Sequence, residues 1–213
     1  MDAVLLGAGG HARVVLDAAR AAGTVEVVAV IDANVKLTGT SFEGIPVVGD
    51  EAMLDELRSR GIESALLGIG SVDVGDGRRA AHARLVAAGF RLPAIIHPRA
   101  VIAPSVTLGD ATVVFAGVIL NPGAALGVNV IVNTGALIDH DARVGDHAHV
   151  SPGARIAGGV SIGEGSHIGI GATVIQGVRI GRRVLVGAGA VVLHDVADGD
   201  RVAGVPASSI RRD

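Results

Sequence analysis

Polar residues that could do chemistry gather in one stretch of the second half of the chain. The stretch runs from Asn133 to Asp141 and reads NTGALIDHD, with His147, His149 and Ser151 following closely. Histidine titrates near neutral pH and can take up a proton, while a neighbouring carboxylate can fix its tautomer. Histidines can also bind zinc. Which of these chemistries is available depends on the residues that the fold brings together.

The stretch lies inside a repeat of six residues that runs from Ala100 to Asp195 without an insertion. The first position of each hexad is Ala, Val, Thr or Ser, and the fourth is often Gly. The third position is aliphatic in all sixteen hexads, at Ile102, Leu108, Val114, Leu120, Leu126, Val132, Ile138, Val144, Val150, Ile156, Ile162, Ile168, Val174, Ile180, Val186 and Val192. This period predicts a parallel β-helix in which three hexads close one triangular coil of 18 residues.

The coil length fixes which residues stack. Gly158 follows His140 by 18 residues, so the two are expected on the same edge of the β-helix, and His167 is expected to stack on His149 in the same way. His140 and His149 differ by nine residues, which is half a coil. They are therefore expected on opposite sides of the β-helix, where only a neighbouring subunit could bring them together.

The chain before the repeat predicts an α/β domain. It opens with a strand at 4–6, a glycine-rich turn GAGGHA at 7–12, a helix at 13–22 and a strand at 25–31 that ends at Asp32. In the pattern G-x-G-x-x-A with an acid some twenty residues on, backbone N–H groups and a helix N-terminus receive phosphate, and the carboxylate binds a ribose hydroxyl. A tight strand-to-helix turn without a ligand explains the pattern equally well.

The rest of this domain completes three or four parallel strands. We expect a crossing loop at 42–49, a helix capped by Asp50, a strand at 65–69 followed by Gly70-Ser71, a helix at 78–88, and an edge strand at 90–96 that contains Pro93. Residues 1–96 thus predict a Rossmann-like domain and residues 97–213 a β-helix domain with a C-terminal tail. The first domain is too short for two mononucleotide halves, so a UDP or GDP moiety fits better than NAD.

Composition excludes several functions. The formal net charge of -3 and the absence of Trp and Tyr argue against a nucleic-acid partner. Without cysteine there is no thiolate metal site and no Cys nucleophile. The N-terminus lacks the features of a signal peptide, so we expect a cytoplasmic protein. Ala111 to Ile138 contains no charged residue, but it keeps the hexad register, so we expect no membrane span.

These motifs resemble the NeuD/PglD group of sugar O- and N-acyltransferases. The matching stretches are LLGAGGHARVV, VIDA, IIHPRAVIAPS, NTGALIDHD, HAHVSPGARIAGGV and VAGVPA. The resemblance implies a nucleotide-sugar-binding domain followed by a left-handed β-helix. It also implies acetyl-CoA as co-substrate, bound in the groove between adjacent β-helices of a homotrimer.

The resemblance implies roles for individual residues as well. His140 matches the general base, Asp141 the acid beside it, and Gly158 a glycine whose backbone N–H faces the acetyl carbonyl. The acetyl-CoA or acceptor site would contain Asn133, His149, Gly158, Gly204 and Pro206. The nucleotide sugar would contact Gly7, Gly9, Gly10, His11, Asp32, Gly70 and Ser71, where Ser71 replaces the Asn that family members usually carry. We interpret His167 and His194 as structural and leave His147 unassigned.

The leading hypothesis is an acetyl-CoA-dependent N-acetyltransferase that acts on a UDP- or GDP-linked 4-amino sugar. Direct transfer is favoured because no cysteine can form an acyl-enzyme, and no metal is expected. O-acetylation of a sialic-type sugar is the alternative within this class, since a helix N-terminus also accepts a free carboxylate. Alternatives of other classes are a zinc hydratase, whose histidine intervals this chain does not match, and a non-catalytic nucleotide-sugar sensor or scaffold.

Overall fold

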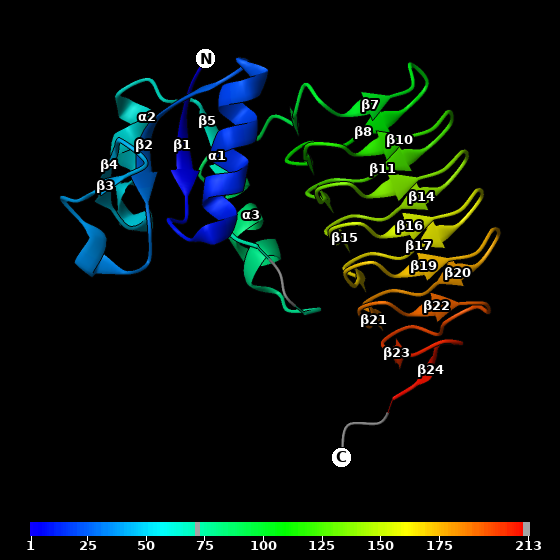
Figure 1. The fold of residues 1–213 in the computed structure, drawn as a ribbon. Coiled ribbons are helices and arrows are strands. Elements are labelled where there is room, and N and C mark those ends of the chain that lie inside the picture. Colours follow the sequence, from blue (N-terminus) through cyan, green and yellow to red (C-terminus); the bar gives the residue numbers. More distant parts are fainter. Residues whose placement is uncertain (71–72, 211–213) are drawn as a thin grey trace. The chain divides into compact units, whose positions relative to one another are not determined.

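The computed structural model describes residues 1–70 and 73–210, and these form two compact units (Figure 1). Residues 1–70 and 76–98 build the first unit, and residues 73–75 and 99–210 build the second.

The first unit is a five-stranded, mostly parallel sheet with helices. The strand order is β3-β4-β2-β1-β5, and β3 alone runs antiparallel to its neighbour. The strands are β1 (Asp2–Leu6), β2 (Glu26–Ile31), β3 (Ser41–Phe42), β4 (Ile45–Gly49) and β5 (Ser64–Leu67). The helices are α1 (Gly10–Ala22), α2 (Leu54–Ser59) and α3 (Gly77–Ala87), with short 3-10 turns η1 (Val35–Leu37) and η2 (Glu51–Met53).

Two expectations for this unit were wrong. Residues 42–49 form a hairpin instead of a crossing loop, because Glu43 and Gly44 both adopt positive φ (51° and 85°) and fold the chain back in a two-residue turn. Residues 90–96 do not add an edge strand to the sheet. Pro93 lacks the N–H that a ladder needs, so only an isolated bridge at Arg91 and the short strand β6 (Ile95–Ile96) form there.

The second unit is a β-helix with three faces, each a sheet of parallel strands (Figure 1). Every hexad contributes a two-residue strand at its second and third positions, and each strand from β7 to β19 pairs with the strand 18 residues on, as Leu137 does with Arg155. The strands are β7 (Val101–Ile102), β8 (Thr107–Leu108), β9 (Val113–Val114), β10 (Ile119–Leu120), β11 (Ala125–Leu126), β12 (Ile131–Val132), β13 (Leu137–Ile138), β14 (Arg143–Val144), β15 (His149–Val150), β16 (Arg155–Ile156), β17 (Ser161–Ile162), β18 (His167–Ile168), β19 (Thr173–Val174), β20 (Arg179–Ile180), β21 (Leu185–Val186) and β22 (Val191–Val192).

We name each face after one of its strands. The β13 face is β7-β10-β13-β16-β19-β22, the β14 face is β8-β11-β14-β17-β20, and the β15 face includes β9-β12-β15-β18-β21. A chain that passes from β13 to β14 to β15 therefore visits all three faces in one coil. Residues nine apart fall on different faces or corners.

The core confirms the predicted period, and a second set of positions, the first of each hexad, also contributes to it. The aliphatic third positions stack in the interior, and the small first positions are buried beside them. Where the first position is Thr112 or Ser166, the hydroxyl donates to the carbonyl 15 residues on (2.8 and 2.7 Å) and accepts the backbone N–H 18 residues on. The fourth-position glycines serve close packing between coils: a β-carbon on Gly109 would lie 2.5 Å from the Gly127 carbonyl carbon.

The period ends at the C-terminal end of the β-helix. β23 (Arg201–Ala203) pairs with β21 across 16 residues instead of 18, and β24 (Ser208–Ser209) turns back antiparallel to β23. The charge-free run 111–138 forms regular coils. In the part of the chain that the structure describes, no helix is long and apolar enough to cross a membrane.

Candidate active site

His140 and Asp141 form a hydrogen-bonded pair at the corner between β13 and β14. His140 Nδ1 lies 2.9 Å from Asp141 Oδ2, and the two side chains are 62% and 74% exposed. Asp141 has φ of 58°, a left-handed conformation that Asp tolerates better than most residues. Because a carboxylate only accepts, Nδ1 carries the proton and Nε2 keeps a lone pair toward solvent. This is the arrangement that a general base requires.

A second carboxylate, which sequence reasoning missed, holds the backbone of this corner. Asp139 Oδ1 accepts hydrogen bonds from the His140 backbone N–H and from Asn121 Nδ2, each 2.7 Å long. These bonds lower the pKa of Asp139, the one from Asn121 most, so the carboxylate stays ionised. The 18-residue interval between Asn121 and Asp139 was the signal in the sequence that pointed to this contact.

The two carboxylates raise the pKa of His140. The hydrogen bond to Asp141 has the largest effect, and the charge of Asp139 adds to it. A raised pKa makes the neutral ring a stronger base, at the cost of a smaller neutral fraction near pH 7. The two carboxylates therefore favour transfer of a proton to His140 from a nucleophile that becomes more acidic as it attacks.

Gly158 lies directly beneath the His140 ring, as the coil length predicted. A β-carbon at Gly158 would lie 2.5 Å from His140 Nε2, and the Gly159 N–H donates to the His140 carbonyl at 2.9 Å. The backbone N–H of Gly158 makes no hydrogen bond to another described residue. A base and a backbone N–H without a described partner therefore lie close together, which suits a reaction that develops an oxyanion while it releases a proton.

His149 sits on the β15 face, away from this corner. Its Nε2 lies 3.3 Å from Asn133 Nδ2. Its ring packs against that of His167 one coil on, with ring centroids 4.5 Å apart and the ring planes tilted by 54°. Ser151 Oγ lies 2.9 Å from His167 Nε2. Both histidines are buried, and burial lowers the pKa of His167. The predicted stacking is confirmed, and one chain does not unite His149 with His140.

The remaining residues expected at the acetyl-CoA site lie at the far end of the β-helix. Gly204 has φ of 93° and its carbonyl accepts from the Val191 N–H at 3.0 Å. Val191 belongs to β22, three strands along the face from β13. Gly204 and Pro206 therefore lie coils away from His140.

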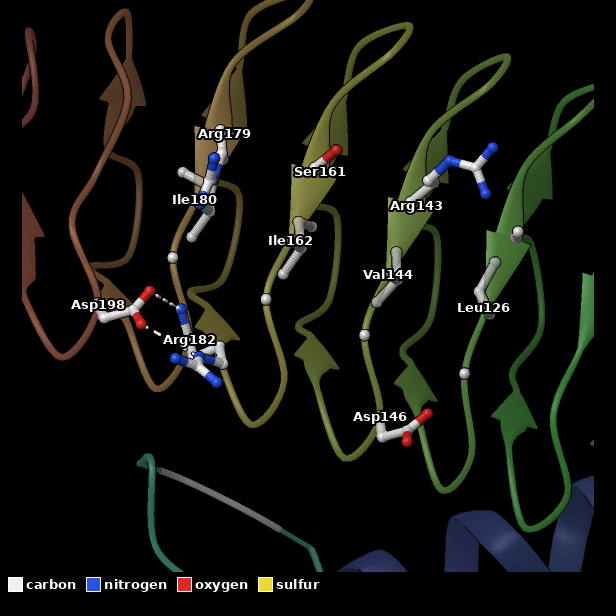
Figure 2. A pocket seen from close by; sticks show the side chains of 15 residues that line it. Leu126, Arg143, Val144, Asp146, Ser161, Ile162, Arg179, Ile180, Arg182 and Asp198 are labelled. Atoms are coloured by element: carbon white, nitrogen blue, oxygen red, sulfur yellow. Dashed lines mark hydrogen bonds and ion pairs between the residues drawn. The ribbon is translucent and has the colours of Figure 1, made fainter.

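A groove that the sequence did not point to follows the β14 face, from Ala125 to Asp198, and Arg143 in its lining is three residues after His140. It encloses about 620 Å³. Figure 2 shows Arg143, Ser161 and Arg179 on three successive strands along it, with Arg182 held by Asp198 at 3.1 Å. The arginines recur at 36-residue spacing in the second hexad position. Such a lining can hold phosphate groups.

The glycine-rich turn of the first unit closes over the carboxyl ends of β1 and β2. Gly7 has φ of 106° and donates to Ile31 O at 2.8 Å. Asp32 accepts the Ala8 N–H through Oδ2 (2.7 Å) and the Asn34 N–H through Oδ1 (2.8 Å). Asp32 thus fixes the turn itself, a role that the sequence pattern did not predict, and its remaining lone pairs can still accept ribose hydroxyls.

The start of α1 faces the end of β5. Gly9 caps α1 without a side-chain hydrogen bond, and Gly10 begins the helix. A β-carbon at Gly70 would lie 3.1 Å from His11 Cβ. Burial, and secondarily the charge of Arg78, lowers the pKa of His11 to about 4, so this ring is neutral at physiological pH. Ser71 lies outside the described residues.

The structure therefore gathers the candidate nucleotide-sugar residues in the first unit and the candidate catalytic residues in the second. In neither unit do three or more described His, Asp or Glu residues come close enough to hold a metal ion.

Comparisons with known families match both halves of the chain. Residues 2–75 match the family model described as PglD N-terminal domain, and residues 159–194 match the model described as bacterial transferase hexapeptide (six repeats). A search of curated protein sequences finds no match.

Solved structures match the whole chain. PerB from Caulobacter crescentus, in complex with CoA and GDP-perosamine, is 41% identical over 99% of this chain and 98% of its own, with a TM-score of 0.93. A histidine-to-alanine mutant of GDP-perosamine N-acetyltransferase from the same organism, with the same two ligands, is 41% identical over 100% of this chain and 98% of its own, with a TM-score of 0.93. The acetyltransferase domain of PglB from Neisseria gonorrhoeae, in complex with acetyl coenzyme A, is 39% identical over 98% of both chains, with a TM-score of 0.89. WeeI from Acinetobacter baumannii is 26% identical over 99% of this chain and 100% of its own, with a TM-score of 0.79.

Proposed function

The chain belongs to the NeuD/PglD-type family of sugar acetyltransferases, and from this premise we propose how it works. It transfers the acetyl group of acetyl-CoA to the amino group of a nucleotide-linked amino sugar, with His140 as general base. The observation that carries the assignment is the His140–Asp141 hydrogen bond of 2.9 Å above the backbone of Gly158.

The reaction follows from this geometry. The sugar amine attacks the thioester carbonyl, and His140 Nε2 takes the proton that the amine loses. The imidazolium that forms is stabilised by Asp141, to which Nδ1–H already donates. The Gly158 N–H donates to the oxyanion of the tetrahedral intermediate. Collapse of the intermediate expels the CoA thiolate, which can take the proton from His140.

We propose a GDP-linked 4-amino sugar as the acceptor. The support is the relative that binds GDP-perosamine and shares 41% of its residues with this chain over nearly its full length. The first unit suits such a ligand, because the start of α1, which no side chain caps, and the turn fixed by Asp32 offer N–H groups to a diphosphate.

We also propose that three copies assemble and that acetyl-CoA binds between neighbouring β-helices. His140 and His149 lie on different sides of one β-helix, so a site that uses both needs a second copy. Val101 and Ile119 leave apolar surface on the β13 face, with 65% and 37% exposure. The basic groove on the β14 face offers arginines for the phosphates of CoA. Sedimentation analysis tests the trimer directly.

The function is tested by thiol release from acetyl-CoA with a panel of acceptors. The panel contains GDP- and UDP-linked 4-amino sugars, their deaminated counterparts and sialic acid. We expect turnover with a nucleotide-linked amino sugar and at least a hundredfold loss of kcat in His140→Ala, since general-base catalysis contributes about 10²–10⁴-fold.

His194→Ala is the matched control, because it removes another β-helix histidine that we interpret as structural. Unchanged turnover in His140→Ala would exclude this residue as the base. Turnover only with sialic acid would replace N-acetylation by O-acetylation.

A further inference from the structure

Arg78 is a buried cation that the catalytic scheme does not use. It lies near the start of α3 and is 5% exposed. Its Nη1 donates to the carbonyls of Leu67 (3.1 Å) and Ile69 (2.6 Å). Nε and Nη2 are equally buried and have no hydrogen-bond partner among the described residues.

A charge in this position is unfavourable unless something compensates it. Within residues 1–70 and 73–210, the guanidinium forms no ion pair with a carboxylate, and burial lowers the pKa of Arg78 to about 9. Two backbone carbonyls are weak compensation for a desolvated cation, whose burial is costly when it is unpaired. The two unused donors, Nε and Nη2, point to an anion that completes the site when it binds.

The anion that fits is the one expected at the neighbouring glycine-rich turn. The segment that Arg78 holds, the end of β5 and the residues after it, packs directly against this turn. A β-carbon at Gly68 would lie 2.7 Å from Ala12 Cβ, and one at Gly70 would lie 3.1 Å from His11 Cβ. The charge of Arg78 acts on His11, in the first turn of α1, strongly enough to help lower its pKa. The start of α1 contains no acidic residue that could compete for Arg78.

We propose that Arg78 supplies the fixed positive charge of the diphosphate site, acting together with the N-terminus of α1, and that its Nε and Nη2 donors become satisfied when the nucleotide diphosphate binds. This inference rests on the proposed function, because it takes a nucleotide sugar as the ligand. It assigns to Arg78 recognition of the phosphates and not of the base or the sugar.

The test separates phosphate recognition from folding by varying the ligand. Titration calorimetry at fixed salt measures the Kd of guanosine, GMP and GDP, and of the uridine series, for wild type, Arg78→Gln and Arg79→Gln. Gln at position 78 removes the charge and keeps a donor for the Leu67 and Ile69 carbonyls. Arg79 is exposed on the same helix. Arg79→Gln is therefore the control, because it removes the same charge as Arg78→Gln from a position outside the proposed site.

We expect Arg78→Gln to raise the Kd of the diphosphate at least tenfold, to raise that of the monophosphate less, and to leave that of the nucleoside within twofold. Arg79→Gln should change none of them by more than twofold. Equal weakening of nucleoside and diphosphate would show a merely structural role and would overturn the proposal, as would an unchanged Kd for the diphosphate.

Arg78→Lys covers the case in which Arg78→Gln does not fold. Lys keeps the charge but has three donors, two of which the carbonyls of Leu67 and Ile69 occupy. Diphosphate affinity should therefore fall severalfold while nucleoside affinity is kept, and a Kd for GDP within twofold of wild type contradicts the proposal. If wild type binds neither GDP nor UDP, the proposed function itself fails, which is distinct from a defect confined to the Arg78 variants.

Discussion

Two pairs of residues on the same β-helix show how one scaffold gives histidine opposite properties. His140 occupies a corner, is 62% exposed and donates to Asp141. His149 and His167 occupy strand positions on the β15 face, where both are buried and their rings are in contact. The pKa of His140 is raised and that of His167 is lowered.

The difference follows from the place of each histidine in its hexad. A corner residue is surrounded by solvent and turn residues, and the turn can carry an acid such as Asp141 because its left-handed position accepts Asp. A second-position strand residue pairs with the same position one coil before and after, which for His149 are Ile131 and His167. In this chain the candidate base therefore lies at a corner, and burial on a face lowers the pKa of His167.

The largest expected effect comes from filling the space beneath the corner histidine. In Gly158→Ala the new β-carbon would lie 2.5 Å from His140 Nε2, so the ring must leave its position. Because the ring is exposed, it can move without unfolding the coil. We expect kcat/KM to fall at least a hundredfold, measured by thiol release, while the Tm changes by only a few degrees.

The double variant Gly158→Ala, His140→Ala serves as control. If Gly158→Ala acts through the His140 ring, the double variant should be no slower than His140→Ala alone. Additive losses would mean that the corner histidine and the glycine beneath it work independently.

Asp141→Asn removes the carboxylate beside His140 and makes the corner electrostatically more like the buried face. Asn also tolerates the left-handed turn, so the backbone is kept. The hydrogen bond to Asp141 is the main cause that raises the pKa of His140, so its loss lowers that pKa. The acid limb of the pH dependence of kcat/KM should move to lower pH, and the maximal rate should fall roughly 10- to 100-fold because the tautomer is no longer fixed.

Asp110→Asn removes an exposed β-helix carboxylate elsewhere and should leave both the limb and the rate unchanged. If the acid limb of the pH dependence of kcat/KM does not move in Asp141→Asn, a group other than His140 determines its position.

The sequence predicted the β-helix better than it predicted the first unit, for a physical reason. Sixteen repeats of one six-residue pattern average out local ambiguity, and the fixed coil of 18 residues turns sequence intervals into spatial contacts. His140 over Gly158 and His149 beside His167 were therefore foreseen. The Asn121–Asp139 hydrogen bond follows from the same interval, but neither residue stood out by type.

The first unit has no such period, and there the misses depend on single turns and tertiary contacts. The Glu43-Gly44 turn converts an expected loop into a hairpin. The sequence did not distinguish Arg78 from other residues of its helix, because its burial depends on how α3 packs against the end of β5. The groove on the β14 face was missed because its arginines are 36 residues apart and only the closed coil aligns them.

The smallest expected effect concerns the buried member of the comparison. Burial lowers the pKa of His167 below its ordinary value of 6.5, and the charge of Asp73 opposes this only partly. The unfolded chain therefore binds more protons than the folded one once the pH falls below about 6.5, so His167 makes the protein less stable as the pH drops toward its folded pKa. In His167→Leu this contribution disappears, and Leu is already the residue at the equivalent position one coil on, Leu185.

Thermal unfolding between pH 7.5 and pH 5 measures the effect. The Tm of wild type should fall by about 2 °C more than that of His167→Leu over this interval, whatever the offset between the two proteins at pH 7.5. His11, whose pKa is also lowered, contributes equally to both and cancels. Parallel curves would mean that His167 is protonated as easily in the folded protein as in the unfolded chain, and the contrast between corner and face would then rest on His140 alone.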